Sequence, residues 1–195
     1  TDYLYSGQWW ISMKDYAPKD ITPIIDFDYV VMAGDYYDGY IYAIAQSDGE
    51  YQCKNVLIKI DPADYSKEVI GKVEYNVMDM AFDYTTGVMY AVVTGGGVNA
   101  LAQIDLTTGE LALVGECDQF LVTLACTAEG KLYSIASDGN LYTVEKTTGA
   151  LTAVASVGYV SATSYQSMAY DHNSGNVYWI DPYGGMSLLD LETGM

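Results

Sequence analysis

Apolar and polar residues alternate along most of this chain in short runs that end at glycine-containing turns. The clearest example is the run Leu132–Ala136, which the Asp138-Gly139 pair separates from the run Leu141–Val144. A period of two residues is typical of strands, and Asp-Gly between two such runs indicates a tight hairpin. No segment carries a 3.6-residue apolar stripe over the roughly 11 residues of an average helix. The pattern therefore predicts an all-β fold.

The strand pattern is organised as a repeat. An apolar residue followed by tyrosine recurs with spacings of 37, 48, 43 and 45 residues, at Tyr5, Tyr42, Tyr90, Tyr133 and Tyr178. A glycine stands shortly before four of these tyrosines, at Gly39, Gly87, Gly130 and Gly175. A second turn motif follows in the segments 105–109, 145–149 and 190–194, each of which ends in Thr-Gly. Four short antiparallel strands in every repeat of about 40 to 45 residues are typical of a β-propeller blade.

The register of the motifs predicts the blade boundaries. We expect full four-stranded blades at about 29–74, 75–117 and 118–158, with partial blades at 1–28 and 159–195. The first and last of about five repeats are then incomplete. We therefore expect a single propeller domain or fragment that belongs to a larger ring, completed by further blades of the same polypeptide or by another copy.

One repeat resembles a known group of propellers. The segment 130–149 reads Gly-x-Leu-Tyr, then a strand, then Glu-x-Thr-Thr-Gly. It is similar to bacterial repeats of the quinoprotein-like and YVTN-like group, although the tryptophan that closes a quinoprotein repeat is missing. The resemblance implies a secreted or cell-surface bacterial protein whose propeller serves as an interaction platform. Nothing matches a pyrroloquinoline site, so no cofactor is expected.

The charge of the chain narrows the choice of partner. It has 26 acidic and 8 basic residues and a formal net charge of −18. Phosphate recognition needs clustered lysine and arginine, so nucleic acid is not an expected partner. No apolar run approaches the roughly 20 residues of a membrane span, so we expect no membrane insertion. The three cysteines leave at least one unpaired, and their spacing does not fit a zinc site.

Carboxylates recur at one position of the repeat, at Asp35, Asp83 and Asp171. They could form a ring of oxygen ligands for Ca²⁺, or each could cap its own hairpin turn. Turn chemistry is the favoured interpretation, because no calcium-loop spacing is present. The single histidine, His172, is expected to be an exposed turn residue. We therefore expect no metal site and no catalytic residue.

Aromatic residues are the most unusual feature, with 20 tyrosines in the chain. Trp179 stands where other repeats place a small residue after the anchor tyrosine, and Trp9 and Trp10 occupy the matching region of the first repeat. Exposed tyrosine and tryptophan provide rigid contact surface for proteins and stacking surface for sugars. The candidate ligand-binding residues are Trp9, Trp10, Trp179, Tyr183, Tyr36 and Tyr37.

These observations favour a non-catalytic β-propeller module that binds a protein or a glycan outside the cell or on the bacterial surface. A propeller enzyme, either a lyase or a glycoside hydrolase, is the first alternative. It would need paired carboxylates at the central channel. The second alternative is a structural assembly unit in which open blade faces join copies of the chain.

Overall fold

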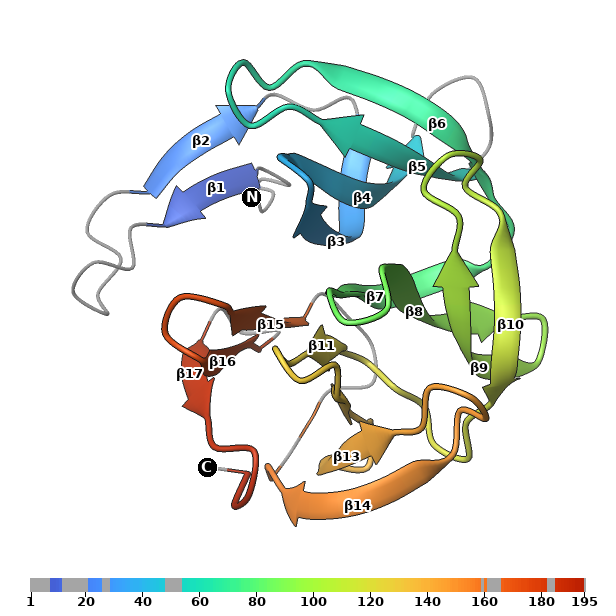
Figure 1. The fold of residues 1–195 in the computed structure, drawn as a ribbon, viewed down its shortest axis with the longest axis vertical. Coiled ribbons are helices and arrows are strands. Elements are labelled where there is room, and N and C mark those ends of the chain that lie inside the picture. The colour runs from blue at the N-terminus through green and yellow to red at the C-terminus, as the bar shows by residue number, and fades with distance from the viewer. Residues whose placement is uncertain are drawn as a thin grey trace, which may run out of the picture.

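The computed structural model describes residues 8–11, 21–25, 29–47, 54–158, 160, 166–181 and 185–194. Four sheets of three or four strands surround a common centre, and a two-stranded sheet precedes them (Figure 1). All sheets are antiparallel, and no helix occurs among the described residues. The predicted all-β propeller is therefore confirmed. Within the described ranges, no helix is long and apolar enough to cross a membrane.

The sheets follow one another along the chain as blades. Blade 1 contains β1 (Gln8–Ile11) and β2 (Ile21–Ile25). Blade 2 contains β3 (Tyr29–Tyr37), β4 (Tyr40–Ser47), β5 (Lys54–Ile60) and β6 (Lys67–Val73). Blade 3 contains β7 (Asn76–Asp83), β8 (Val88–Gly95), β9 (Val98–Ile104) and β10 (Leu111–Glu116). Blade 4 contains β11 (Ala125–Cys126), β12 (Leu132–Ile135), β13 (Asn140–Val144) and β14 (Leu151–Ser156). Blade 5 contains β15 (Ser167–Asp171), β16 (Asn176–Ile180) and β17 (Met186–Leu189). Completion of the ring by further blades stays a prediction.

The repeated tyrosines set a common register that allows the blades to be compared. Tyr5 lies outside the described residues, and each of the other four lies in the second strand of its blade and pairs with a residue of the inner strand. Tyr90, Tyr133 and Tyr178 face Ala81, Ala125 and Ala169. Tyr42 of blade 2 faces Asp35 instead. Small residues fit the crowded centre of a propeller, so Asp35 is the exception at this position.

The hydrophobic core lies between the blades. The inner strand β7 contacts the inner strands β3, β11 and β15 near the centre (Figure 1). One apolar cluster joins blades 2 and 3, a second joins blades 3 and 4, and a third joins blades 4 and 5. Buried side chains such as Leu57, Leu101 and Leu141 occupy the same register position in successive blades. Packing between blades therefore stabilises the ring.

The second repeated motif, the turn that ends in Thr-Gly, packs against the outer strand of the preceding blade. The Thr108-Gly109 turn of blade 3 packs against Gly71 of β6, where a Cβ atom would lie 1.9 Å from the Thr108 carbonyl oxygen. Gly115 of β10 would meet the Thr148 carbonyl oxygen of blade 4 at the same 1.9 Å. A register shift next to each of these glycines bends the outer strand toward the next blade. The motif thus joins the outer edges of neighbouring blades.

Candidate functional site

Asp35 lies on the inner strand of blade 2 and connects that blade to the next one. Its Oδ2 accepts a hydrogen bond of 2.6 Å from the Phe82 backbone N–H, and its Oδ1 accepts one of 2.7 Å from the Tyr36 N–H. Burial raises the pKa of Asp35, and these two hydrogen bonds oppose that rise. The favoured interpretation of Asp35 as a turn cap is wrong. The two-residue turn here is Asp38-Gly39, and both residues have positive φ.

An aromatic cluster surrounds the end of the channel near Asp35. We call Tyr36, Tyr84, Tyr170 and His172 the aromatic mouth. The His172 ring lies 4.7 Å from the Tyr84 ring and 4.9 Å from the Tyr170 ring. The Tyr84 hydroxyl donates a 2.8 Å hydrogen bond to the Tyr36 carbonyl oxygen. These contacts join blades 2, 3 and 5, so the mouth is a surface built from three blades.

Two further aromatic rings support the mouth from below. Tyr37 stacks on Phe82, with 3.8 Å between the ring centroids. Phe82 is buried and lies edge-on to Tyr84 at 4.9 Å. The side chains of Tyr36 and Tyr84 remain 51% and 48% exposed. The mouth therefore presents exposed aromatic surface in which the Tyr84 ring packs against both Phe82 and His172.

The antiparallel order of the strands places the turns of the mouth on one face of the propeller. The turn between the first and second strands and the turn between the third and fourth strands lie at the same end of a blade. Tyr84 and His172 belong to turns of the first kind, and the segments 105–109 and 145–149 belong to the second kind. We call this end of the propeller the mouth face.

A small cavity of about 20 Å³ lies behind the mouth. It is lined by residues of the inner strands β3, β7, β11 and β15, including Asp35, Met80 and Cys126, and by His172 of the turn after β15. A cavity of that size holds about one water molecule. A sugar ring would not fit in it.

Asp79 is a second buried carboxylate on the inner strands, and it joins three blades. Its Oδ2 accepts hydrogen bonds from the Leu124 N–H at 2.8 Å and the Met168 N–H at 3.1 Å, and its Oδ1 accepts one from the Met80 N–H at 3.0 Å. The Ser167 hydroxyl lies 3.2 Å from Oδ1. Burial raises the pKa of Asp79 to about 8, although the hydrogen bonds favour the ionised form. Asp79 is 1% exposed, so its role is to hold the inner strands together.

Asp83 and Asp171 act in their turns, as the favoured interpretation of these two residues predicts. Asp83 accepts hydrogen bonds from the Thr85 N–H and hydroxyl and from the Thr86 hydroxyl. Asp171 likewise accepts bonds from the Asn173 N–H and the Ser174 hydroxyl. Within the described ranges, no group of three or more histidine, cysteine, aspartate or glutamate side chains could hold a metal ion.

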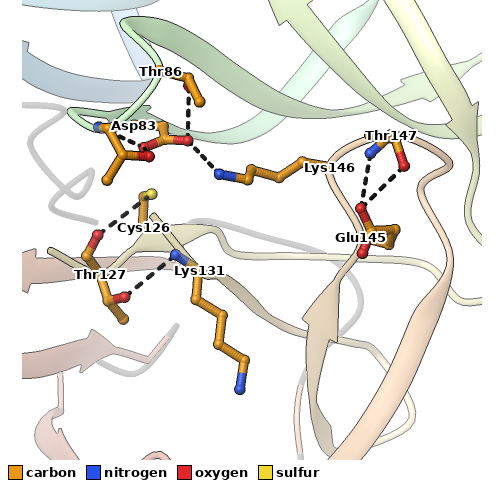
Figure 2. Close-up of polar contacts among 9 residues, drawn as sticks. Asp83, Thr86, Cys126, Thr127, Lys131, Glu145, Lys146 and Thr147 are labelled. Carbon is orange, nitrogen blue, oxygen red and sulfur yellow. Dashed lines mark hydrogen bonds and ion pairs between the residues drawn. The ribbon is translucent and has the colours of Figure 1, made fainter. Parts of the chain in front are cut away.

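Asp83 also forms an ion pair across the contact between blades 3 and 4. Lys146 Nζ lies 2.6 Å from Asp83 Oδ2, and the Asp83 side chain is fully buried (Figure 2). Burial raises the pKa of Asp83, but the hydrogen bonds from Lys146, Thr85 and Thr86 outweigh it and hold the pKa at about 2. The contact also includes Cys126, a buried free cysteine (Figure 2).

The predicted binding residues occupy different parts of the molecule. Tyr36 belongs to the mouth and Tyr37 lies beneath it. Trp179 is half-buried against the core of blades 4 and 5, and its indole N–H donates to Gln166 Oε1 at 3.2 Å. Trp9 and Trp10 lie in β1, for which only the backbone is described, and Tyr183 lies outside the described residues.

Three residues of the mouth, Tyr84, Tyr170 and His172, were not among the predicted binding residues. Tyr84 follows Asp83 and His172 follows Asp171, so both occupy the second position of the same repeated turn. That shared position was a usable signal, because equivalent turns of a propeller lie on one face. Only the arrangement of the blades around a common centre, however, brings residues 88 positions apart into ring contact.

The comparisons with known proteins agree with this architecture. A family model described as "Repeat of unknown function (DUF6923)" matches residues 12–195. No curated protein matches the sequence. The structure titled "Crystal structure of Nidogen/Laminin Complex" is similar with a TM-score of 0.64 and 10% identity, over 94% of this chain and 74% of that chain. TolB from Acinetobacter baumannii is similar with a TM-score of 0.58 and 13% identity, over 91% of this chain and 45% of that chain. At these identities the likeness shows the fold alone.

Proposed function

This chain belongs to the repeat family DUF6923, and we propose that it is a non-catalytic propeller that binds a protein partner at the aromatic mouth. The observation that carries the proposal is the exposure of Tyr36 and Tyr84 on a rigid support. Ordered tyrosines lose little conformational entropy on binding and often dominate the energy of an interface.

The surroundings of the mouth support a protein partner over channel chemistry. The cavity of about 20 Å³ behind the mouth is too small for a sugar ring. The mouth itself is open, and its rings come from three blades, which suits a broad contact surface. The similar structure titled "Crystal structure of Nidogen/Laminin Complex" is a complex of proteins, which supports a protein partner for this fold, although the sequence identity is only 10%.

The rest of the proposal concerns location and ligand class. We place the module outside the cell or on a bacterial surface, on the strength of the acidic composition and the repeat resemblance. A glycan ligand is the competing possibility at the same tyrosines, because sugar rings also stack on aromatic side chains. The test below separates the two ligand classes.

The test compares the wild-type chain with a double variant, Tyr36→Ser with Tyr84→Ser. Each chain is immobilised and exposed to proteins of the source cell and, separately, to a glycan array. A protein that the wild type retains is purified, and its affinity is measured by calorimetry. We expect the double variant to bind it at least about tenfold more weakly, as expected for the loss of two interface tyrosines.

The matched control removes exposed apolar side chains that lie away from the mouth. Val69→Ser with Leu113→Ser changes two residues of the outer strands, which are 54% and 47% exposed. This control should bind like the wild type. An equal loss in both double variants would contradict the proposal, as would unchanged binding by the tyrosine variant. Binding only to glycans would show that the ligand class is wrong.

A further inference from the structure

The contacts between successive blades contain equivalent positions that can be compared directly. Tyr37 and Asp83 occupy the same register position, because each lies opposite the residue two before an anchor tyrosine. Phe82 and Cys126 are also equivalent, because each lies opposite the residue directly before an anchor tyrosine. Leu106 and Lys146 are equivalent as the second residues of their Thr-Thr-Gly turns.

The contact between blades 3 and 4 contains its own cation. Lys146 extends from the third–fourth strand turn of blade 4 and reaches Asp83 of blade 3 (Figure 2). Hydrogen bonding to Asp83 raises the pKa of Lys146, so the ammonium stays charged. The position is therefore occupied by a lysine side chain whose stem runs between the blades.

A hollow lies beside the contact between blades 2 and 3, where Leu106 stands in place of Lys146. Tyr37 of blade 2 lines it, and its other lining residues belong to blade 3. Its volume is about 490 Å³, within the range of small-ligand sites. We call it the interblade pocket. Its walls include Tyr37, Phe82, Leu106 and Leu111. These apolar side chains suit the methylene stem of a long side chain.

The rim of the interblade pocket is negatively charged. Asp105 and Glu110 line it, and no basic residue is among its lining residues in the described part of the chain. The hydrogen bond from the Thr107 hydroxyl lowers the pKa of Asp105, so this carboxylate is ionised at neutral pH. A cation that entered the pocket would meet negative charge at the rim.

We propose that the interblade pocket binds a lysine side chain of the partner protein, with its stem against Tyr37 and Leu106 and its ammonium at Asp105 and Glu110. The inference rests on the proposed protein-binding function. The pocket adjoins the aromatic mouth, because Tyr37 stacks on Phe82 and Phe82 contacts Tyr84. A partner bound at the mouth can therefore place a lysine in the pocket without a second docking surface.

The pocket is tested with short peptides, independently of the partner. The probe is an acetylated and amidated peptide of the sequence Gly-Ser-Lys-Ser-Gly, titrated to millimolar concentration. Binding is followed through the methyl resonances of Leu106 and Leu111 by NMR. We expect a peptide with norleucine in place of lysine to bind about tenfold more weakly, because it lacks charge-assisted hydrogen bonds.

The sharpest variant is Leu106→Lys, which places in blade 3 the residue that blade 4 already carries. The new ammonium would occupy the pocket and repel the peptide lysine, so binding should fall by at least about tenfold. Glu110→Gln removes rim charge without filling the pocket and should weaken binding about threefold. The matched control is Glu145→Gln, which removes one charge from the equivalent turn of blade 4.

Each outcome supports or overturns the proposal that the interblade pocket binds lysine. Loss in the Leu106→Lys and Glu110→Gln variants with normal binding by Glu145→Gln supports it. Equal loss in Glu145→Gln would show non-specific attraction to an acidic protein and would overturn it. Equal binding of the norleucine peptide, or no methyl shifts in the wild type, would also overturn it.

The peptide experiment and the partner experiment fail in different ways. Tyr36→Ser with Tyr84→Ser leaves the pocket walls in place, so that variant should still bind the lysine peptide. If it binds the peptide and also retains the partner, the mouth proposal fails and the pocket stands. If partner binding depends on the mouth but not on Leu106→Lys, the pocket proposal fails alone.

Discussion

The contact between blades 2 and 3 and the contact between blades 3 and 4 solve the same packing problem differently. At the first, Tyr37 stacks on buried Phe82. At the second, the equivalent position carries Asp83, and Lys146 neutralises it at 2.6 Å. Both contacts also use an inner-strand aspartate that accepts a backbone N–H of the next blade, Asp35 in one and Asp79 in the other. Both contacts thus have an aspartate that bonds to the backbone of the next blade, at different register positions, while an aromatic pair in one is replaced by an ion pair in the other.

The difference shows where the two contacts gain their stability. An aromatic pair gains from burial and leaves the neighbouring volume free for a ligand. A buried ion pair fills that volume with a lysine stem, and it gains little over an apolar pair because both charges lose hydration. We therefore expect the aromatic contact to lose most stability when a buried ring is removed. The ionic contact should lose stability when Lys146 alone is removed, because Asp83 then stays buried without its cation.

The largest expected effect is the truncation of Phe82. Phe82→Ala removes a buried ring beneath the mouth and should lower the free energy of unfolding by about 4 kcal/mol. The equivalent change in the next contact, Cys126→Ala, removes only a sulfur atom and should cost about 1 kcal/mol. Urea denaturation of both variants measures the difference. Equal losses would show that the two contacts do not differ in the way described.

The next effect concerns what both contacts share. Gly71→Ala and Gly115→Ala should each lower stability by about 2–3 kcal/mol, because the added Cβ meets a backbone carbonyl that cannot move freely. Ala155, in the equivalent position of blade 4, provides the control, and Ala155→Gly should change stability by about 1 kcal/mol. Thermal unfolding gives the ranking. A tolerated alanine at Gly71 alone would mean that the two outer joints are not equivalent.

The ion pair is expected to have an intermediate effect. Lys146→Met leaves the buried Asp83 without its cation and should cost about 2 kcal/mol, because the threonine hydrogen bonds remain. Lys131→Met, which changes an exposed lysine of the same blade, should cost about 0.5 kcal/mol or less. The Asp83 pKa of about 2 stabilises the fold above about pH 4, and this stability is lost as the pH falls toward 2. In Lys146→Met that acid transition should shrink, which guanidinium titrations at several pH values would detect.

The most gradual effect is the pH dependence that Asp79 contributes, because it is spread over several pH units. Its folded pKa of about 8 exceeds the unfolded value of 3.8, so the folded state holds the extra proton between them. Stability should therefore fall as the pH rises from about 4 to 8, by about 1 kcal/mol between pH 7 and pH 8. Asp79→Asn does not titrate and should flatten the slope. A wild-type curve that stays flat in this range would mean that the three N–H donors keep Asp79 ionised.

Local chemistry explains why much of the fold was predictable. The anchor tyrosines, the glycines before them and the Thr-Thr-Gly turns act over a few residues, and each carries a strong conformational preference. Gly109 and Gly149 adopt the positive φ that such turns require. The turn roles of Asp83 and Asp171 follow from the same local pattern. Strand order within a blade then follows because consecutive strands pair through short turns.

The candidate site was less predictable, because its residues are distant in sequence. Asp35 looks like Asp83 and Asp171 in the printed sequence, yet the tight Asp38-Gly39 turn places it further inside its strand. It pairs with the anchor Tyr42, whereas Asp83 pairs with Val88 at the end of its strand. Asp79 has no motif at all. Its three N–H donors come from three blades, and they converge only where the inner strands meet.

The sequence by itself determined the all-β repeat, the turns and the acidic charge, since each depends on residues that are neighbours along the chain. The tertiary structure alone decided which tyrosines form the mouth, which blade contact holds a lysine and which holds a pocket. The packing of blades around the centre brings Tyr84 beside His172 and sets Lys146 against Asp83. Such contacts depend on how whole blades pack, and small changes at one repeat position decide whether that position is filled or open.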